Sequence, residues 1–340
     1  MNYRAAVFHD TEHITIQTKE VRKPGPKEVL IRVRACGVCG TDLHLYHGAP
    51  GSASATPPVV LGHEFAGEVT ETGSDVTDLR SGDQVTVDPN LACGDCWYCR
   101  NGERNLCSNL TAIGVNFDGG FAEYCLVPFS QVYRFDRPVS HHHAAMAEPL
   151  ACCLHGIDRV ALKQGQTVAV VGCGAIGLIM VQLAFLGGAS RVYASDPVAK
   201  RRDLAEQLGA VPVDPGRQEL PTVIRRDIPE GVDSAVECAG NPAAMLQAFQ
   251  SVRRGGTVLL FSVPEADAVL NVPVYDIYFR ELRILGSFTN PATQGRAVDL
   301  VSSGRIQLEQ LISHQLPLES IKDAFRLFGK PDAIKIVVAL

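Results

Sequence analysis

Apolar and polar residues alternate in the first third of the chain, which is the pattern of strands that bury one face. Val29, Ile31 and Val33 are separated by residues that include Arg32, and Arg34 follows. A period of two predicts half-buried β-strand. Turn-forming clusters that contain Gly or Pro interrupt this pattern at 24–26, 57–58, 82–83 and 118–120. The pattern therefore predicts a β-rich first domain.

From about Glu148 the pattern changes to short apolar strands that alternate with helices. The expected strands are 167–171, 191–195, 233–237 and 257–261, and the expected helices are 176–186, 198–208 and 243–252. This alternation predicts an α/β domain whose parallel sheet is built from βαβ units. Further on, a strand is expected at 284–288, helices at 294–303 and 319–328, and a final strand at 334–339. This last segment could extend the parallel sheet or return to the first domain.

Composition and charge narrow the class of protein. A chain of 340 residues with 46% hydrophobic and 20% charged residues is long enough for two packed domains. A net charge of −6 without blocks of Lys and Arg argues against a nucleic-acid partner, and no apolar run has the length of a membrane span. Residues 1–7 do not resemble a secretion signal, so we expect a cytoplasmic protein.

Four of the eleven cysteines lie within fifteen residues, in a stretch typical of a loop. Cys93, Cys96, Cys99 and Cys107 have the spacing Cys-x2-Cys-x2-Cys-x7-Cys. Four thiolates can enclose one tetrahedral Zn²⁺, an arrangement typical of structural zinc sites. Disulfide pairing is the alternative, but it requires an oxidising compartment, of which residues 1–7 give no sign. We therefore predict a structural zinc loop at about 89–108.

Other cysteines and histidines have simpler interpretations. Five cysteines have apolar neighbours and are expected to be small core residues. They are Cys125, Cys152, Cys153, Cys173 and Cys238. The three consecutive histidines 141–143 cannot all face one site, so we interpret them as the solvated start of a helix after Ser140.

A glycine motif follows the first strand of the α/β domain. Gly172, Gly174 and Gly177 match Gly-x-Gly-x-x-Gly, with Ala175 and Ile176 between them, where the strand ends and a helix begins. The first glycine permits a tight turn, the second lets a pyrophosphate approach the backbone, and the third lets the helix pack on the strand. An α/β domain that needs glycines only for turning is the alternative. Because strand, motif and helix coincide, the motif predicts a dinucleotide site.

An acidic residue ends the second strand of this domain. Asp196 lies nineteen residues after Gly177, where a carboxylate is expected to bind the adenosine ribose hydroxyls. A carboxylate there repels a 2′-phosphate, so NAD is favoured over NADP. Arg201 and Arg202 follow on the next helix and could soften this preference, although a solvated helix face is their simpler interpretation.

Two more groups of metal-binding residue types precede the cysteine loop. One is the segment Cys36-Gly37-Val38-Cys39-Gly40-Thr41-Asp42-Leu43-His44, and the other is Gly62-His63-Glu64. Alone, the first could be a redox Cys-x-x-Cys, and His63 could be a core histidine. Together with the cysteine loop and the glycine motif, they closely resemble the zinc-dependent medium-chain dehydrogenase/reductase family over essentially the full chain. The subgroup resembled is that of sorbitol, other polyol and threonine dehydrogenases.

The resemblance implies a fold. Members of this family have a GroES-like catalytic domain, discontinuous in sequence, and a Rossmann domain. The expected bounds here are 1–148 with 286–340 for the catalytic domain and 149–285 for the Rossmann domain. The resemblance thus favours a return of the last segment to the first domain. It also implies a homotetramer or a homodimer.

The resemblance further implies a catalytic zinc, so that each chain would bind two zinc ions. The family's Cys and His ligands correspond to Cys39 and His63. The third ligand of the polyol group is a carboxylate, which corresponds either to Glu64 or, often through a water, to Glu148 in the segment Glu-Pro-Leu. Both candidates stay open, and Cys152 and Cys153 are not expected to replace Glu148. Three protein ligands leave a position for a substrate oxygen, and zinc lowers the pKa of a bound alcohol.

Proton release has candidate residues next to the expected ligands. The resemblance assigns it to the Thr41 hydroxyl, then the cofactor ribose, then His44. Ordinary loop packing is the alternative for both side chains. Asp42 would orient a metal ligand by a hydrogen bond.

The segment after the α/β domain departs from the animal sorbitol dehydrogenases. In those enzymes an Arg follows Gly-x-Phe, whereas Thr289 has that position here. Candidate pocket residues mix polar and aromatic groups, which suits a polyhydroxylated substrate better than a long aliphatic alcohol. They are Tyr46, Asn116, Phe117, Thr289 and Asn290.

The sequence therefore predicts a zinc- and NAD-dependent dehydrogenase that oxidises a secondary alcohol, such as a polyol, to a ketone. L-Threonine 3-dehydrogenase or a butanediol-type dehydrogenase with the same machinery is the alternative. A non-catalytic NAD-binding protein and the zinc-free quinone reductase branch are more distant alternatives. A purely structural role would need none of Cys39, Thr41, His44, His63, Glu64 and Glu148.

Overall fold

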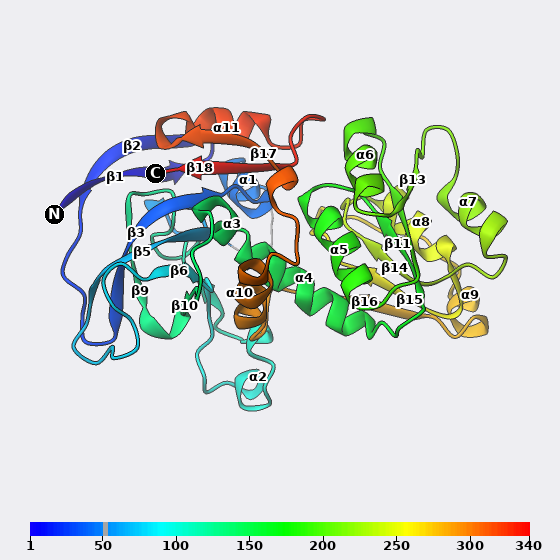
Figure 1. Ribbon diagram of the computed structural model, residues 1–340, viewed down its shortest axis with the longest axis horizontal. Coiled ribbons are helices and arrows are strands. Elements are labelled where there is room, and N and C mark those ends of the chain that lie inside the picture. Colours follow the sequence, from blue (N-terminus) through cyan, green and yellow to red (C-terminus); the bar gives the residue numbers. More distant parts are fainter. Residues whose placement is uncertain (50–53) are drawn as a thin grey trace. The chain divides into compact units, whose positions relative to one another are not determined.

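The computed structural model describes residues 1–49 and 54–340, and it forms two compact units (Figure 1). Unit 1 comprises Met1–Ala151 and Thr289–Leu340, and unit 2 comprises Cys152–Phe288. The bounds expected from the resemblance, 148/149 and 285/286, each lie three residues earlier. The predicted fold class, a β-rich domain with a parallel-sheet α/β domain, is confirmed.

Unit 1 is built on a sheet that is antiparallel except for the parallel pair β17 and β18, the last strand of the chain. The strand order is β10-β6-β5-β3-β18-β17, and β9 also pairs with β3. The bounds are β3 (Glu28–Gly37), β5 (Glu64–Thr72), β6 (Gln84–Val87), β9 (Tyr124–Pro128), β10 (Val132–Arg134), β17 (Ile312–Pro317) and β18 (Lys335–Ala339). Because β18 pairs with β3 through Val337 and Gly37, the last segment returns to the first unit.

Two smaller sheets and several short helices complete unit 1. The sheets are β2-β1-β4 (His13–Glu20, Asn2–Asp10, Val59–Val60) and β7-β8 (Asn90–Leu91, Thr111–Ala112). The α-helices are α1 (Gly40–Tyr46), α2 (Trp97–Arg100), α3 (His141–Ala145), α10 (Gln294–Ser303) and α11 (Ile321–Leu327). Short 3-10 helices lie at Arg104–Leu106, Phe129–Gln131, Glu309–Leu311 and Leu318–Ser320. Alternation along the strands buries apolar side chains such as Ile31, Val33 and Phe65 in one core.

Two local predictions for this unit need correction. The triple histidine does start α3 after Ser140, but its side chains are half-buried rather than solvated, and His143 Nε2 lies 2.8 Å from Glu309 Oε2. No helix was expected directly after it, yet α4 (Ala147–Val160) begins there and includes the last residue of unit 1. Pro149 is tolerated because it lies in the first turn, where no intrahelical N–H donor is needed.

Unit 2 contains an all-parallel sheet in the order β13-β12-β11-β14-β15-β16. The strands are β11 (Thr167–Val171), β12 (Arg191–Ser195), β13 (Val211–Val213), β14 (Val232–Glu237), β15 (Val252–Leu260) and β16 (Arg283–Gly286). The helices are α5 (Ala175–Leu186), α6 (Ala199–Gln207), α7 (Leu220–Asp227), α8 (Pro242–Ser251) and α9 (Val274–Phe279). The strand order reverses between β11 and β14, and ligands bind at the carboxyl ends of strands at such a point.

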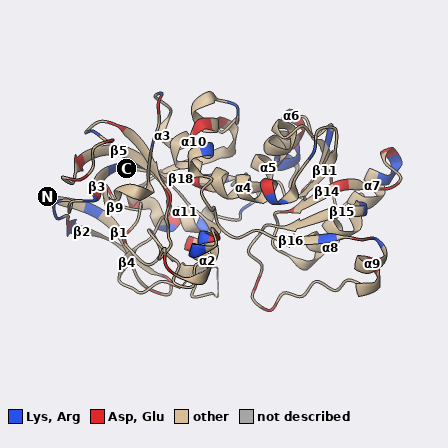
Figure 2. Ribbon diagram, turned by 90° about the horizontal axis from the view of Figure 1, so that it is seen from below, with Lys and Arg blue, Asp and Glu red and all other residues tan. Residues whose placement is uncertain are grey.

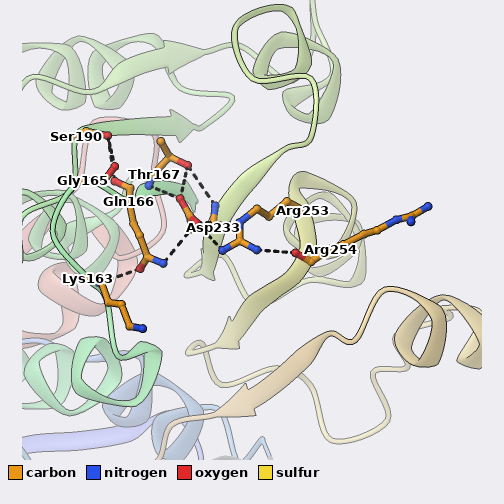
Figure 3. A network of polar contacts seen from close by, with 8 residues as sticks. All are labelled: Lys163, Gly165, Gln166, Thr167, Ser190, Asp233, Arg253 and Arg254. Atoms are coloured by element: carbon orange, nitrogen blue, oxygen red, sulfur yellow. Dashed lines mark hydrogen bonds and ion pairs between the residues drawn. The ribbon is translucent and has the colours of Figure 1, made fainter.

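The amino ends of these strands are held by one half-buried carboxylate (Figure 3). Asp233 accepts hydrogen bonds from the Thr167 backbone N–H at 2.8 Å, from the Thr167 hydroxyl at 3.0 Å and from Arg253 Nε at 2.9 Å. Partial burial would raise the pKa of Asp233, but the bonds from Thr167 and Arg253 outweigh it and lower the pKa. Asp233 therefore ties β14 to β11 and β15 as an ionised side chain.

Charged side chains of both signs are interspersed along the elements of each unit (Figure 2). None of the helices in residues 1–49 and 54–340 combines the length and the hydropathy needed to cross a membrane.

Candidate active site

Three potential metal ligands meet where two central strands of unit 1 end and begin. Cys39 precedes α1, just after β3, while His63 and Glu64 stand at the start of β5. One donor atom from each residue lies within 4.8 Å of the other two. His63 and Glu64 are buried and Cys39 is half-buried, so a metal bound there would be sheltered from bulk solvent.

A buried carboxylate holds two of these residues. Asp42 is fully buried; its Oδ2 accepts a 2.9 Å hydrogen bond from the Cys39 backbone N–H, and its Oδ1 lies 3.5 Å from His63 Nδ1. Because Nδ1 faces Asp42, Nε2 is the nitrogen of His63 that is left to bind a metal. Burial lowers the pKa of His63, but Asp42 and Cys39 outweigh that effect and raise it well above its ordinary value. Asp42 thus orients both chain segments that carry ligands.

The third residue of the group has a partner that sequence reasoning missed. Glu64 forms an ion pair with Lys335 of β18, and Lys335 Nζ also donates a 3.0 Å hydrogen bond to the Val38 carbonyl. Burial lowers the pKa of Lys335, but the charges of Glu64 and Cys39 raise it overall. The only sign of this partner in the sequence was a lysine inside the apolar run Ile334-Lys335-Ile336-Val337. Such a run does not predict the direction of the lysine side chain.

The remaining predicted residues of this site lie on α1 and α4. Glu148 is buried in the first turn of α4 but lies outside the group of three whose donor atoms are within 4.8 Å. Its charge nevertheless acts on Lys335, which places both carboxylates in one electrostatic environment. Thr41 and His44 are half-buried on α1. His44 Nδ1 is buried without a hydrogen-bond partner in the described part of the chain, so its ring has a polar atom to offer a ligand.

The cysteine loop brings its four sulfurs together. All four Sγ atoms lie within 4.8 Å of one another, with Cys107 Sγ 3.4 Å and Cys99 Sγ 4.0 Å from Cys93 Sγ. Four thiolates bound tetrahedrally to zinc at about 2.3 Å would be about 3.8 Å apart, which fits this spacing. The backbone N–H groups of Cys93 and Asn109 donate to Cys107 Sγ at 3.3 Å and lower the pKa of that thiol. The loop therefore offers a closed set of thiolates.

The glycine motif in unit 2 has the conformation that the sequence predicted. Gly172 ends β11 with φ +94°, and a Cβ there would lie 2.9 Å from the Ala239 backbone nitrogen. A Cβ on Gly177 would lie 1.8 Å from the Gly172 carbonyl oxygen, so α5 packs directly against the turn. Around Gly174 there is open space. This open space lies at the start of α5, where the helix N-terminus would favour a pyrophosphate.

The acidic residue after β12 is held by the same turn. Asp196 Oδ2 accepts from the Cys173 backbone N–H and Oδ1 from the Val198 backbone N–H, both at 2.8 Å. Arg201 Nη1 lies 3.9 Å from Asp196 Oδ2, and Arg202 donates to the Asp196 carbonyl at 2.7 Å. Neither arginine lies on a solvated face, because both face the segment around Asp196.

A second carboxylate, which sequence reasoning also missed, shapes the carboxyl end of β14. Glu237 is fully buried and accepts from the backbone N–H groups of Ala239 at 2.6 Å and Gly240 at 2.7 Å. Ser262 donates to its other oxygen. Because Ala239 abuts Gly172, Glu237 fixes the loop beside the glycine turn. An acid at a strand end resembles a ligand-binding residue in sequence, so only its bonds reveal this structural role.

Two of the five candidate pocket residues have their amides occupied within unit 1. Asn116 accepts from the Ala112 backbone N–H and donates to the Ser54 carbonyl, both at 2.9 Å. Asn290 is buried and donates to Gln294 at 3.2 Å. These hydrogen bonds hold the two amides against neighbouring groups of unit 1, and their expected place in a pocket stays a prediction.

Two family models match the chain, one for each kind of domain. The alcohol dehydrogenase GroES-like domain matches residues 25–137, and the zinc-binding dehydrogenase model matches residues 175–303. Sorbitol dehydrogenase of Bacillus subtilis is 35% identical, over 99% of this chain and 97% of that protein. The chain belongs to the zinc-dependent medium-chain dehydrogenase/reductase family. As a member of this family it is an oxidoreductase that uses zinc and a nicotinamide cofactor.

Other family members with the same architecture differ in their substrates. L-Threonine 3-dehydrogenase of Caldanaerobacter subterraneus is 34% identical, over 96% of this chain and 95% of that protein. A zinc-binding dehydrogenase of Sinorhizobium meliloti, with NADP bound, has a TM-score of 0.96 and 42% identity over the full length of both chains. The structure of 2R,3R-butanediol dehydrogenase of Bacillus subtilis has a TM-score of 0.92 and 31% identity, over 99% of each chain.

The donor groups described here fit what the family binds. Sulfur, imidazole and carboxylate are the usual zinc ligands, and both groups of donors are compact enough for one ion. The open space at Gly174 and the buried acid Asp196 suit a dinucleotide.

Proposed function

We propose that this protein is an NAD-dependent dehydrogenase that oxidises a secondary alcohol of a polyol to a ketone. The observation that carries the proposal is the compact group of Cys39, His63 and Glu64 in unit 1. A zinc ion with three protein ligands keeps one position for a substrate oxygen, unlike the all-cysteine loop. Several relatives are named for polyhydroxylated compounds, among them sorbitol, D-arabinitol and L-galactonate.

L-Threonine is the second candidate substrate, and a butanediol is the third. Threonine 3-dehydrogenases from several bacteria and from Pyrococcus horikoshii are 33 to 35% identical to this chain, a level similar to that of the sorbitol enzyme. The same metal ligands would serve all three reactions, since each oxidises a secondary hydroxyl group. The choice therefore depends on residues around the substrate rather than on the metal group.

The residues of the chain itself would bind the metal, orient the substrate and remove its proton. When bound, zinc lowers the pKa of the substrate hydroxyl and NAD accepts the hydride. Cys39 and His63 would hold the metal, with Glu64 or Glu148 as the third ligand. We propose that the Thr41 hydroxyl accepts the substrate proton first and that His44 passes it to solvent. Support comes from their position on α1, directly after Cys39, and from the unsatisfied Nδ1 of His44.

NAD is the proposed cofactor. Asp196 is buried at the carboxyl end of β12 and keeps its charge close to the expected ribose site. A carboxylate in this position disfavours a 2′-phosphate. Arg201 and Arg202 lie beside Asp196 and would weaken its repulsion of a 2′-phosphate. The S. meliloti relative was crystallised with NADP. We therefore expect a preference for NAD that Asp196→Ala would weaken or reverse, measured as the ratio of kcat/KM for the two cofactors.

We further propose two zinc ions per chain, a cytoplasmic location and a homotetramer or homodimer. The thiolate groups favour a reducing compartment. Association is supported by aromatic side chains on α9 of unit 2, where Tyr275 is 66% and Tyr278 is 78% exposed. Next to this helix, β16 is the last strand of the sheet, and its outer edge could pair with β16 of a second copy. Light scattering of the wild type and of Tyr278→Arg tests this surface.

A substrate screen tests this function, and the absorbance of the NADH that forms is its readout. Zinc-quantified protein is assayed with linear polyols, inositols, L-threonine, 2,3-butanediol and simple secondary alcohols, each repeated with Cys39→Ser. Activity on polyols that Cys39→Ser abolishes supports the proposal, whereas activity on L-threonine alone selects the second candidate. If the protein binds NADH and about two zinc ions per chain but shows no activity on any compound, that result contradicts a catalytic role.

A further inference from the structure

Three arginines of unit 2 lie close together without a carboxylate partner. They are Arg225 of α7, Arg254 of β15 and Arg280, which directly follows α9. Within residues 1–49 and 54–340 none of the three forms an ion pair, whereas the adjacent Arg253 pairs with Asp233 at 2.8 Å. The side chain of Arg254 extends away from that pair (Figure 3). These three residues, the arginine cluster, therefore carry positive charge that no ion pair neutralises.

The backbone between α8 and β15 brings two of the three side chains together. Arg225 Nη2 donates a 2.7 Å hydrogen bond to the Gln250 carbonyl, and Arg280 Nη2 donates to the Val252 carbonyl. Residues two apart in a chain are separated by at most about 7 Å. The guanidinium groups of Arg225 and Arg280 are thus attached to the same short stretch of backbone.

Arg254 is attached to this region through the end of α9. Its guanidinium lies 4.7 Å from the centre of the ring of Phe279, the residue before Arg280. The Gly255 backbone N–H donates to the Arg280 carbonyl at 2.7 Å, which holds the end of α9 against the start of β15. Arg254 is exposed, and its guanidinium donates to no carbonyl or carboxylate in the described part of the chain. The N–H groups of Arg254 can therefore bind a ligand.

The three positive charges act on one another. Burial lowers the pKa of Arg280, and the charges of Arg225 and Arg254 lower it further. Asp276 has the opposite effect but does not outweigh them. Capping of α8 explains part of the cluster, because carbonyls at the C-terminus of a helix attract cations. It does not explain Arg254, which binds none of those carbonyls.

We propose that the arginine cluster binds the phosphate group of a small phosphorylated molecule. A phosphate monoester carries about −1.5 to −2 charges at neutral pH, and its three free oxygens accept hydrogen bonds from separate directions. A carboxylate carries one charge on two oxygens that lie in one plane, so it matches three guanidinium groups less well. A phosphate group is therefore the anion that this cluster fits best.

The arginine cluster is separate from the glycine motif. Gly172 follows the carboxyl end of β11, whereas Arg254 lies near the amino end of β15. Because β11, β14 and β15 are parallel, the two groups lie at opposite ends of the strands. A phosphate bound by the cluster would therefore not be the pyrophosphate of a dinucleotide at the glycine turn, and it would take no part in the oxidation.

Titration of the protein with inorganic phosphate, followed by the line width in phosphorus NMR, tests this site. Saturating NADH occupies the dinucleotide site, and sodium chloride keeps the ionic strength constant. Binding should be saturable, and Arg254→Met should weaken it on the order of tenfold through loss of a charge-assisted hydrogen bond. Arg254→Lys keeps a charge and should bind within about threefold of the wild type.

The next residue of α7 supplies a matched control. Arg226 donates to Gln218 Oε1 at 2.8 Å instead of to the Gln250 carbonyl. Arg226→Met should keep the wild-type affinity within about twofold, because exposed charges that do not touch the anion are screened. Arg225→Met should weaken binding on the order of tenfold. Equal affinity in the wild type and Arg254→Met, equal weakening in Arg226→Met, or absence of saturable binding would each overturn the proposal.

Competition by other anions tests the chemical class of the ligand. Sulfate is a tetrahedral dianion and should displace phosphate, whereas acetate should compete at least about tenfold more weakly. Acetate that competes as well as sulfate would overturn the assignment to a phosphate group. Arg254 is exposed and its guanidinium contacts only a ring, so Arg254→Met should fold like the wild type, which circular dichroism checks.

Discussion

The two groups of metal-binding residues in unit 1 are built in opposite ways. The cysteine loop takes four like ligands from fifteen consecutive residues, 93–107, and Cys93 is exposed. The group around Cys39 takes unlike ligands from the end of β3 and the start of β5, and its buried partners include Lys335 of β18. The ligands of the cysteine loop come together within one short segment, whereas the ligands around Cys39 are brought together only by the tertiary fold.

This difference separates stability from chemistry. A zinc ion bound by four thiolates would have no free coordination position, so in the cysteine loop it would stabilise the loop and bind no substrate. The second group keeps carboxylates, an imidazole and an ammonium in contact inside a core. There the stability of each charged group depends on its charged neighbours. We therefore expect substitutions in the loop to act on unfolding and substitutions in the second group to act on turnover.

The largest expected effect is on turnover, from His63→Asn. Loss of a ligand removes the stabilisation that zinc gives to the developing charge, worth several kcal/mol, so kcat/KM should fall by at least about 10³-fold. The zinc of the cysteine loop should stay bound. Kinetics and metal analysis on the same sample check both statements. Retention of more than a tenth of wild-type activity would remove His63 from the site.

Cys96→Ser should have the converse effect. Metal binding and folding of the loop are coupled, so loss of one thiolate should lower the free energy of unfolding by about 3 kcal/mol or more. For a chain of this size that corresponds to a fall in Tm of roughly 4 °C. Calorimetry measures the fall, and residual activity well below the new Tm should remain. An unchanged Tm with lost activity would reverse the assignment of the two groups.

Asp42→Asn should have an intermediate effect. The amide can keep the contact with the Cys39 backbone only in one orientation, and it removes the charge beside His63 Nδ1. Loss of such a supporting carboxylate typically costs about 10- to 100-fold in metal affinity or activity. Competition with a chelator measures the affinity. Wild-type affinity in Asp42→Asn would show that Asp42 only caps α1.

The smallest effect is expected at a carboxylate of the other unit, Asp233 of unit 2. Its pKa is lowered by Thr167 and Arg253, so its contribution is fully present above the unfolded-state pKa, about 3.9, and is lost as the pH falls through the lower folded-state pKa. Because the group is partly exposed and screened, Asp233→Asn should cost about 1 kcal/mol at neutral pH. Urea unfolding at neutral and acid pH measures both. A difference between the two proteins that does not shrink in acid would contradict an ionised Asp233.

Local patterns made some features predictable from the sequence. The glycine motif, the cysteine loop and the strand-helix alternation each lie within a few dozen residues, so their geometry follows from spacing and backbone preferences. The bounds of β11 and β12 follow for the same reason, whereas β13 was not expected and β15 begins at Val252 rather than at 257. Helix α4 escaped prediction because its first turn contains a Glu-Pro step, which also fits a turn, and several of its apolar positions hold only Ala or Cys.

Contacts between distant segments could not be predicted in this way. Lys335 and Glu237 look like an ordinary charged residue in a strand and an ordinary acid at a strand end, and only tertiary hydrogen bonds give them their roles. Asn116 shows the same limit, since its bonds with the Ala112 backbone N–H and the Ser54 carbonyl could not be inferred from its place in the sequence. Charged and amide groups form hydrogen bonds with whichever partner the fold places beside them, and a single sequence does not identify that partner.

The partnership of Glu64 with Lys335 also has a consequence for biosynthesis. The ribosome adds Lys335 271 residues after Glu64, when the whole of Cys152–Phe288 has already been made. Until β18 arrives, the nascent first unit holds an acidic side chain that lacks its counterion and a sheet that lacks a central strand. Domains generally fold as units during synthesis, but this one has to wait for its last strand while the intervening domain can fold ahead of it.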